Sequence, residues 1–144
     1  MKFQSTPSIP VTQKQRGSPE HFDLHWTILQ QARDLIADPG RWHKGSLAAR
    51  ADGEPVPWAD KQASKWCATG ALYVCALRHT KNLQEAERLG LETASMIYPK
   101  HCALLALQGL NDGAGQHFVL ALFERTLRKR EPQNLDRSED LLQA

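Results

Sequence analysis

The most apolar run of the chain is WCATGALYVCALR, residues 66–78. Charged residues flank it, and it is shorter than the roughly 20 residues that a membrane-spanning helix needs. We therefore expect a buried central helix with Cys67 near its start. Gly70 lies among small neighbours, which predicts close approach of a second backbone at this point. Trp66 is expected to cover one end of the small-residue face.

The composition indicates one ordinary globular domain. A length of 144 residues, with 41% hydrophobic and 24% charged residues, is typical of a soluble single-domain protein. The net charge of +2 is too small to indicate a polyanionic partner by itself. The chain starts without the apolar segment of a secretory signal, and its three cysteines have no paired spacing. We therefore expect free thiols and a cytoplasmic location.

Helical spacing of apolar residues recurs on both sides of the central run. A capping box at Asn82 and Glu85 predicts the start of a helix there. Asp60 is expected to cap the central helix. Arg41–Arg50 is expected to form a short helix, and residues 51–57 form a loop or small hairpin by composition. Two further helices are predicted over 19–37 and from 82 to the stop at Pro99. A short apolar segment over 103–110 and a turn over 111–115 follow. The last predicted helix covers 116–130, and the residues expected to face inward are Phe118, Val119, Leu122, Phe123 and Thr126.

No segment shows the alternation of a strand. The predicted fold is all-α, a compact bundle of four to five helices with one long irregular connection at residues 50–59. The predicted organisation is a flexible N-terminal arm over 1–17, a single all-α domain over 18–130 and a polar C-terminal tail over 131–144.

Two blocks of sequence carry a resemblance when read together. The first is WCATGAL at residues 66–72, and the second is LNDGAGQH at residues 110–117, followed by VLALF at 119–123. With the leading helix that ends in DPGRW at 38–42, they resemble a family of small bacterial and phage proteins known only as a domain of unknown function. The resemblance covers about residues 25–129. It implies an all-α fold and a prokaryotic or phage origin, and it implies no chemistry.

One candidate site is catalytic. A cysteine near a helix start has a lowered pKa and a reactive thiolate, and it needs a base and an orienting group. Cys67, His117 and Asp112 would supply these roles in a small hydrolase or transferase if the two helix starts converge. The competing interpretation is structural, since free cysteine is among the most buried residue types and Asp112 is an ordinary turn residue.

Metal and cofactor sites have weaker support. The pairs His21/His25 and Cys75/His79 have helical spacing, but structural zinc needs four ligands, usually in close pairs, and the chain has no Cys-x-x-Cys. No glycine-rich phosphate loop follows a strand. We therefore predict no metal and no cofactor.

Two kinds of macromolecular partner are also considered. Residues 83–97 faintly resemble a helix-turn-helix, although one uninterrupted helix fits them as well. The basic cluster Arg125, Arg128, Lys129 and Arg130 would contact phosphates or a protein, or only stabilise a helix end. Trp42 and Trp58 lie in or beside irregular segments, where an exposed tryptophan would be an interface hot spot. The competing and favoured interpretation is that they cover the core beneath the long connection.

The leading prediction is a non-enzymatic accessory protein that binds, and thereby inhibits or regulates, another protein. Its predicted interface consists of Trp42, Trp58 and the basic cluster. The cysteine enzyme is the alternative prediction, and a nucleic-acid-binding protein is the third.

Overall fold

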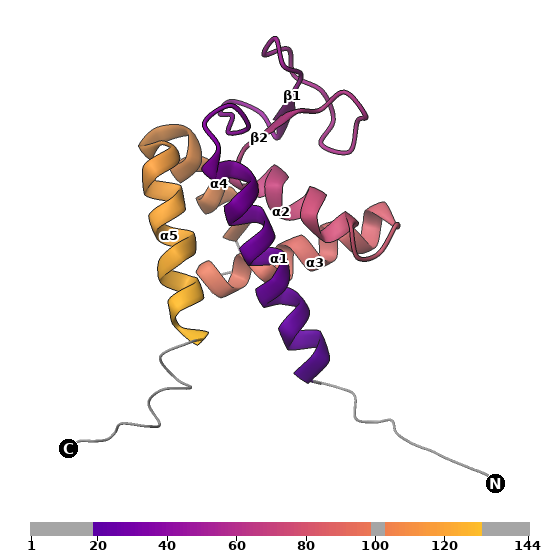
Figure 1. Cartoon of the computed structure of the whole chain (residues 1–144), viewed down its shortest axis with the longest axis vertical. Coiled ribbons are helices and arrows are strands. Elements are labelled where there is room, and N and C mark those ends of the chain that lie inside the picture. Colours follow the sequence, from indigo (N-terminus) through magenta and orange to yellow (C-terminus); the bar gives the residue numbers. More distant parts are fainter. Residues whose placement is uncertain (1–18, 99–102, 131–144) are drawn as a thin grey trace, which may run out of the picture.

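The computed structural model describes residues 19–98 and 103–130, and the side chains of residues 23–98 and 106–130. The predicted arm over 1–17 and tail over 131–144 lie outside these residues. The described part contains five helices and one two-stranded sheet (Figure 1). The all-α prediction is therefore confirmed.

Helix α1 (Pro19–Ala37) has the predicted bounds and lies between α5 and α2 (Figure 1). Its apolar stripe places Ile28, Leu29 and Ile36 in the core, where each is fully buried. The helix ends in a tight turn, in which Gly40 N donates to Asp38 Oδ1 at 2.8 Å. This turn redirects the chain into the long connection above the helices.

The predicted helix over 41–50 is wrong. Instead, β1 (Ala48–Ala49) pairs antiparallel with β2 (Lys65–Trp66). Both alanines are fully buried, and the carbonyl of Ala48 accepts from Val56 N at 3.1 Å. Hydrogen bonds to distant parts of the connection thus replace the local bonds of a helix. The predicted turn is present, with Gly53 at φ +93°.

Helix α2 (Ala68–Leu77) starts later than predicted, because Cys67 and not Asp60 is its cap. Asp60 closes a turn in the connection, where its Oδ1 accepts from Gln62 N at 2.7 Å. The predicted close approach at Gly70 is confirmed, because a Cβ there would lie 2.1 Å from Leu47 O. This glycine lets the connection lie directly on the start of α2.

Helix α3 (Leu83–Ile97) is uninterrupted, so the helix-turn-helix prediction is wrong. Its predicted cap is confirmed, since Asn82 Oδ1 accepts from Glu85 N at 2.9 Å. It packs against α2 at Gly90, where a Cβ would lie 2.6 Å from the Tyr73 ring.

Helices α4 (Ala103–Ala114) and α5 (Gln116–Arg128) form a hairpin. The predicted turn over 111–115 is mostly wrong, since Asn111 lies within α4 and the chain reverses at Gly115, with φ +94°. Asn111 is fully buried. A polar side chain that the sequence places in a solvated turn thus faces the interior, next to the start of α2.

Candidate functional site

Cys67 is built into the fold as a helix cap. Its thiol sulfur accepts a hydrogen bond from Gly70 N at 3.3 Å, and its own N–H donates to Leu47 O at 3.2 Å. The residue has no exposed surface. Burial raises the pKa of the Cys67 thiol, and this effect outweighs the lowering by the backbone N–H groups around it. The thiol is therefore kept protonated and out of reach of a substrate.

The structure does not assemble the predicted triad of Cys67, His117 and Asp112. His117 is exposed in the first turn of α5, and no hydrogen bond joins it to Cys67 in the described part of the chain. The Asp112 carboxylate instead accepts from Gly45 N at 3.1 Å. Its charge also helps to raise the pKa of the cysteine, whereas a catalytic site would need it lowered.

Asn111 is the polar centre of this region. Its Oδ1 accepts from Trp42 Nε1 at 2.8 Å and from Ala68 N at 3.0 Å, and its Nδ2 donates to His43 O at 3.0 Å and to Asp112 Oδ1 at 3.1 Å. All four hydrogen-bonding positions of the amide are therefore used. The side chain ties α4 to the connection and to the start of α2, which is a structural role.

His43 lies in the same region and is not among the site residues predicted from the sequence. Its backbone N–H donates to Trp66 O at 3.0 Å, and its Nε2 lies 2.8 Å from Ser46 Oγ. Burial, with the nearby charge of Lys65, lowers the pKa of His43. The ring is therefore neutral at pH 7. The sequence carries no signal for this position, because the contacts depend on how the connection folds back.

The two tryptophans of the predicted interface are not free surface anchors. Trp58 is buried, its ring centroid lies 5.3 Å from that of Tyr73, and its Nε1 donates to Glu87 at 3.4 Å. Trp42 is half-buried and is held by Asn111. Both stabilise the connection against the helices, which favours the interpretation that they cover the core, and their place in an interface stays a prediction.

A metal site is not assembled among the described residues, where no three His, Cys, Asp or Glu side chains are grouped. Burial raises the pKa of Cys75 to about 11, and His79 Nε2 lies 2.9 Å from Gln31 Oε1. In this pair, Cys75 is therefore a buried packing residue, and His79 forms a hydrogen bond with Gln31. His21 belongs to the segment whose side chains are not described.

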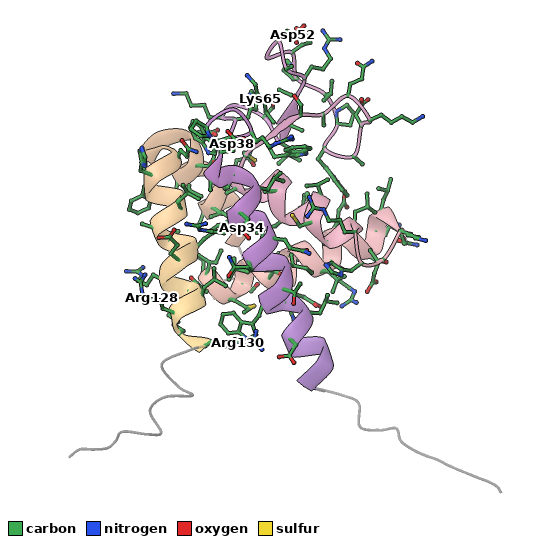
Figure 2. The ribbon with its side chains drawn as sticks, viewed as in Figure 1. Asp34, Asp38, Asp52, Lys65, Arg128 and Arg130 are labelled. Atoms are coloured by element: carbon green, nitrogen blue, oxygen red, sulfur yellow. The ribbon has the colours of Figure 1, made fainter. Side chains whose placement is uncertain are left out.

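The basic cluster divides into two parts. Arg130 turns toward α1, where it pairs with Asp23 at 2.9 Å and lies over the Trp26 ring at 5.8 Å (Figure 2). Arg128 lies on the opposite side of α5, away from α1 (Figure 2). Arg125, Arg128 and Lys129 are exposed, and none of them forms an ion pair with another described residue.

A groove with three apolar and two basic lining residues adjoins these cations. It has a volume of about 200 Å³. Phe118 is 45% exposed at its edge, so the expectation that this side chain faces inward is wrong. Phe118 precedes the buried Val119 by one residue, which rotates it by about 100° from the core, and a helical projection would have shown this. We call the five residues that line the groove the outer face of α5: Phe118, Ala121, Leu122, Arg125 and Arg128.

A family model matches residues 26–129, which is most of the chain. The chain belongs to the family of unknown function DUF6197. The match includes the Cys67 cap, Asn111 and the whole outer face of α5. No curated protein and no solved structure matches this DUF6197 protein. In the residues that the structure describes, none of the helices has the length and apolar character needed to cross a membrane.

Proposed function

We propose that this DUF6197 protein is a non-enzymatic accessory protein that binds an acidic protein partner through the outer face of α5. The observation that carries the proposal is the exposed Phe118 in one groove with two arginines that form no ion pair with another described residue. Binding there would inhibit or regulate the partner by covering part of its surface. The predicted prokaryotic or phage origin and cytoplasmic location are part of the same proposal.

The charges support an acidic partner. Four described arginines pair with carboxylates of this chain, whereas Arg125 and Arg128 pair with none of the described carboxylates. Glu124, which adjoins Arg125 in the sequence, is paired with Arg33 of α1. Two copies of this face would repel each other, so self-association through it is disfavoured. The four paired arginines are Arg33, Arg50, Arg88 and Arg130.

The apolar groove favours a protein over a nucleic acid. Cations near the C-terminal end of α5 are already explained by the helix dipole, and phosphate contacts would need only the cations. Neither explanation accounts for an exposed Phe118 in one groove with Ala121 and Leu122. An exposed aromatic side chain and arginines that line one groove are typical of a protein interface. The complementary segment therefore carries an apolar side chain flanked by Asp or Glu.

Site-directed photo-crosslinking tests this proposal. A photo-crosslinking phenylalanine derivative is placed at position 118 and, as a matched control, at Leu83, which is 54% exposed on α3. A protein captured in the native host only from position 118 is then purified, and its affinity is measured. Phe118→Ala should weaken binding about fivefold, because its remaining exposed surface is worth roughly 1 kcal/mol when buried. The double variant Arg125→Glu/Arg128→Glu should weaken it about tenfold or more.

Two results would contradict the proposal. Equal capture from positions 118 and 83 would mean that the groove has no specific partner. The protein could also be retained on heparin in a salt-sensitive way that requires Arg125 and Arg128 but not Phe118. That result would indicate a nucleic acid and not a protein as the partner. Circular dichroism of each variant checks that the exposed substitutions leave the fold unchanged.

A further inference from the structure

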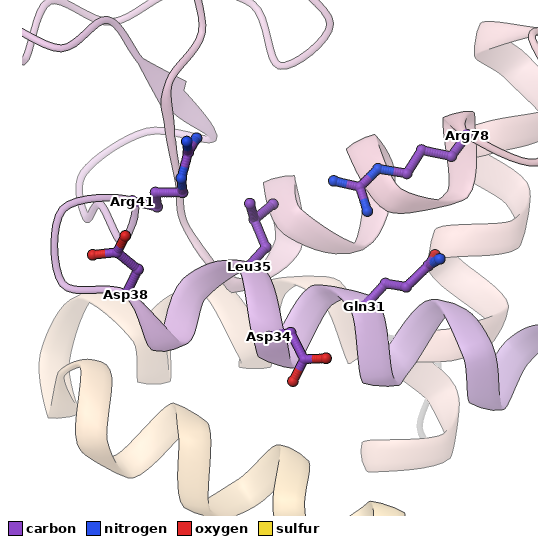
Figure 3. Close-up of a pocket in the computed structure, with 6 residues that line it drawn as sticks. All are labelled: Gln31, Asp34, Leu35, Asp38, Arg41 and Arg78. Atoms are coloured by element: carbon purple, nitrogen blue, oxygen red, sulfur yellow. The ribbon is translucent and has the colours of Figure 1, made fainter.

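A second groove lies between α1 and α2, on a different part of the molecule from the outer face of α5. Its volume is about 360 Å³. Arg41 and Arg78 extend from its two ends, and Leu35 lies between them (Figure 3). Gln31, Asp34 and Asp38 complete the lining. The groove therefore has a cation at each end and an apolar side chain in the middle.

The two arginines have no acidic partner in the part of the chain that the structure describes, although two aspartates line the same groove. Asp34 accepts from Arg33 at 3.2 Å, and it points away from both guanidinium groups of the groove (Figure 3). Asp38 Oδ1 accepts from Gly40 N in the turn that ends α1. Neither Arg41 nor Arg78 forms an ion pair within residues 19–98 and 103–130. Both guanidinium groups thus keep their donors available.

The backbone at each end is fixed by the fold. Arg41 O accepts from Trp66 N at 2.8 Å, which anchors this residue to β2. Arg78 is the C-cap of α2, and its N–H donates to Cys75 O at 3.2 Å. The backbone positions of the two arginines are therefore set by the packing of α1, α2 and the connection, which limits how far apart their guanidinium groups lie. A ligand that contacts both must match that spacing.

We propose that this groove binds a small organic dianion whose two acidic groups are separated by a short hydrocarbon segment. Each guanidinium would donate paired hydrogen bonds to one acidic group, and the hydrocarbon would cover Leu35. Asp38 lies at the Arg41 end and opposes this binding, so Arg78 is the stronger anchor. This site does not depend on the partner proposed for α5.

Titration with linear dicarboxylates, from succinate to suberate, tests the site by NMR with labelled leucine methyl groups. Affinity should pass through an optimum with chain length, and inorganic phosphate should bind more weakly than the best dicarboxylate. Arg78→Gln should weaken binding of that dicarboxylate about tenfold, and Arg41→Gln should weaken it by a smaller factor. Both side chains are exposed, so these variants should fold. Lys61→Gln, which removes an exposed cation of the connection that lines neither groove, should leave the affinity unchanged.

Asp38→Asn should change the affinity for the dicarboxylate in the opposite direction. Its side-chain oxygen still accepts from Gly40 N, while the negative charge is removed, so the dianion should bind more tightly. Weaker binding in this variant would show that the ligand also uses the carboxylate, and it would overturn the assignment of a dianion. No chain-length optimum, or equal binding of phosphate, would overturn the two-point site. Loss of partner binding through α5 would leave these results unaffected.

Discussion

Replacing Asn111 with aspartate tests the polar centre of the fold with a change of one atom. The side-chain oxygen that accepts from Trp42 and Ala68 is retained. The amide nitrogen, which donates to His43 O at 3.0 Å and to Asp112 Oδ1 at 3.1 Å, becomes a second oxygen. Two hydrogen bonds are thus turned into contacts between acceptors in a site that has no exposed surface.

The expected cost is large. A buried polar group left without its partner costs about 1–3 kcal/mol, and two such losses at Asn111 sum to about 4 kcal/mol. The new carboxylate is also buried beside Asp112, which raises its pKa above the unfolded value of about 3.9. Natural domains are stable by only about 5–15 kcal/mol. We therefore expect Asn111→Asp to lose a large part of the free energy of unfolding at pH 7.

The pH dependence distinguishes the buried charge from the lost hydrogen bonds. Below about pH 3.9 the new carboxyl is protonated in both the folded and the unfolded state, so its charge costs nothing. As the pH rises through the folded pKa, the folded state must ionise a buried group or keep its proton, and stability falls. Urea denaturation, followed by circular dichroism between pH 3.5 and pH 8, should show this decrease relative to the wild type.

Asn82→Asp is the matched control, because the same chemical change is made at an exposed helix cap. Aspartate caps a helix about as well as asparagine, so this variant should keep its stability within roughly 0.5 kcal/mol. If Asn111→Asp were as stable as Asn82→Asp and had the same pH profile, the hydrogen bonds around Asn111 would not be what holds α4 to the connection. Adding Asp112→Asn to Asn111→Asp should recover part of the loss, because one of the two facing charges is removed.

Three further changes probe the same region. Gly70→Ala should destabilise the protein by about 3 kcal/mol or more in thermal or urea unfolding, because its Cβ would lie 2.1 Å from a backbone carbonyl oxygen. As its control, Gly109→Ala lies at an exposed helical position with open space, so it should stabilise the protein by about 1 kcal/mol. In a variant without the other two cysteines, Cys67 should react with a disulfide reagent only on unfolding, and fast reaction of the folded protein would refute its burial. His43, whose pKa is lowered by burial, should contribute stability above about pH 6.5 that is lost as the pH falls; His43→Gln should lack this step.

Local rules predicted the helices whose ends depend on neighbouring residues. The start of α1 and the cap of α3 are determined by side chains within one turn, so the sequence predicts them well. The end of α4 was mispredicted because Asn111 and Asp112 favour turns in isolation. Their polar groups are satisfied instead by the connection, which lies far away in the sequence.

The two candidate binding surfaces also differ in how far the sequence predicts them. Basic residues near the end of α5 could be identified from composition alone. Only the packing of α1 shows that Arg130 is paired, whereas Arg125 and Arg128 have no ion-pair partner among the described residues. The groove between Arg41 and Arg78 has no signal in the sequence, since its two ends lie on different elements.

The sequence by itself determined an all-α domain and the close contact at Gly70, because helical periodicity and residue size act locally. Tertiary structure alone decided the role of Cys67. The residue is either reactive or buried according to what covers the start of α2, and the cover consists of Leu47 in the connection and Asn111 of α4. Both approach from distant parts of the chain, and together they turn a potential nucleophile into a helix cap.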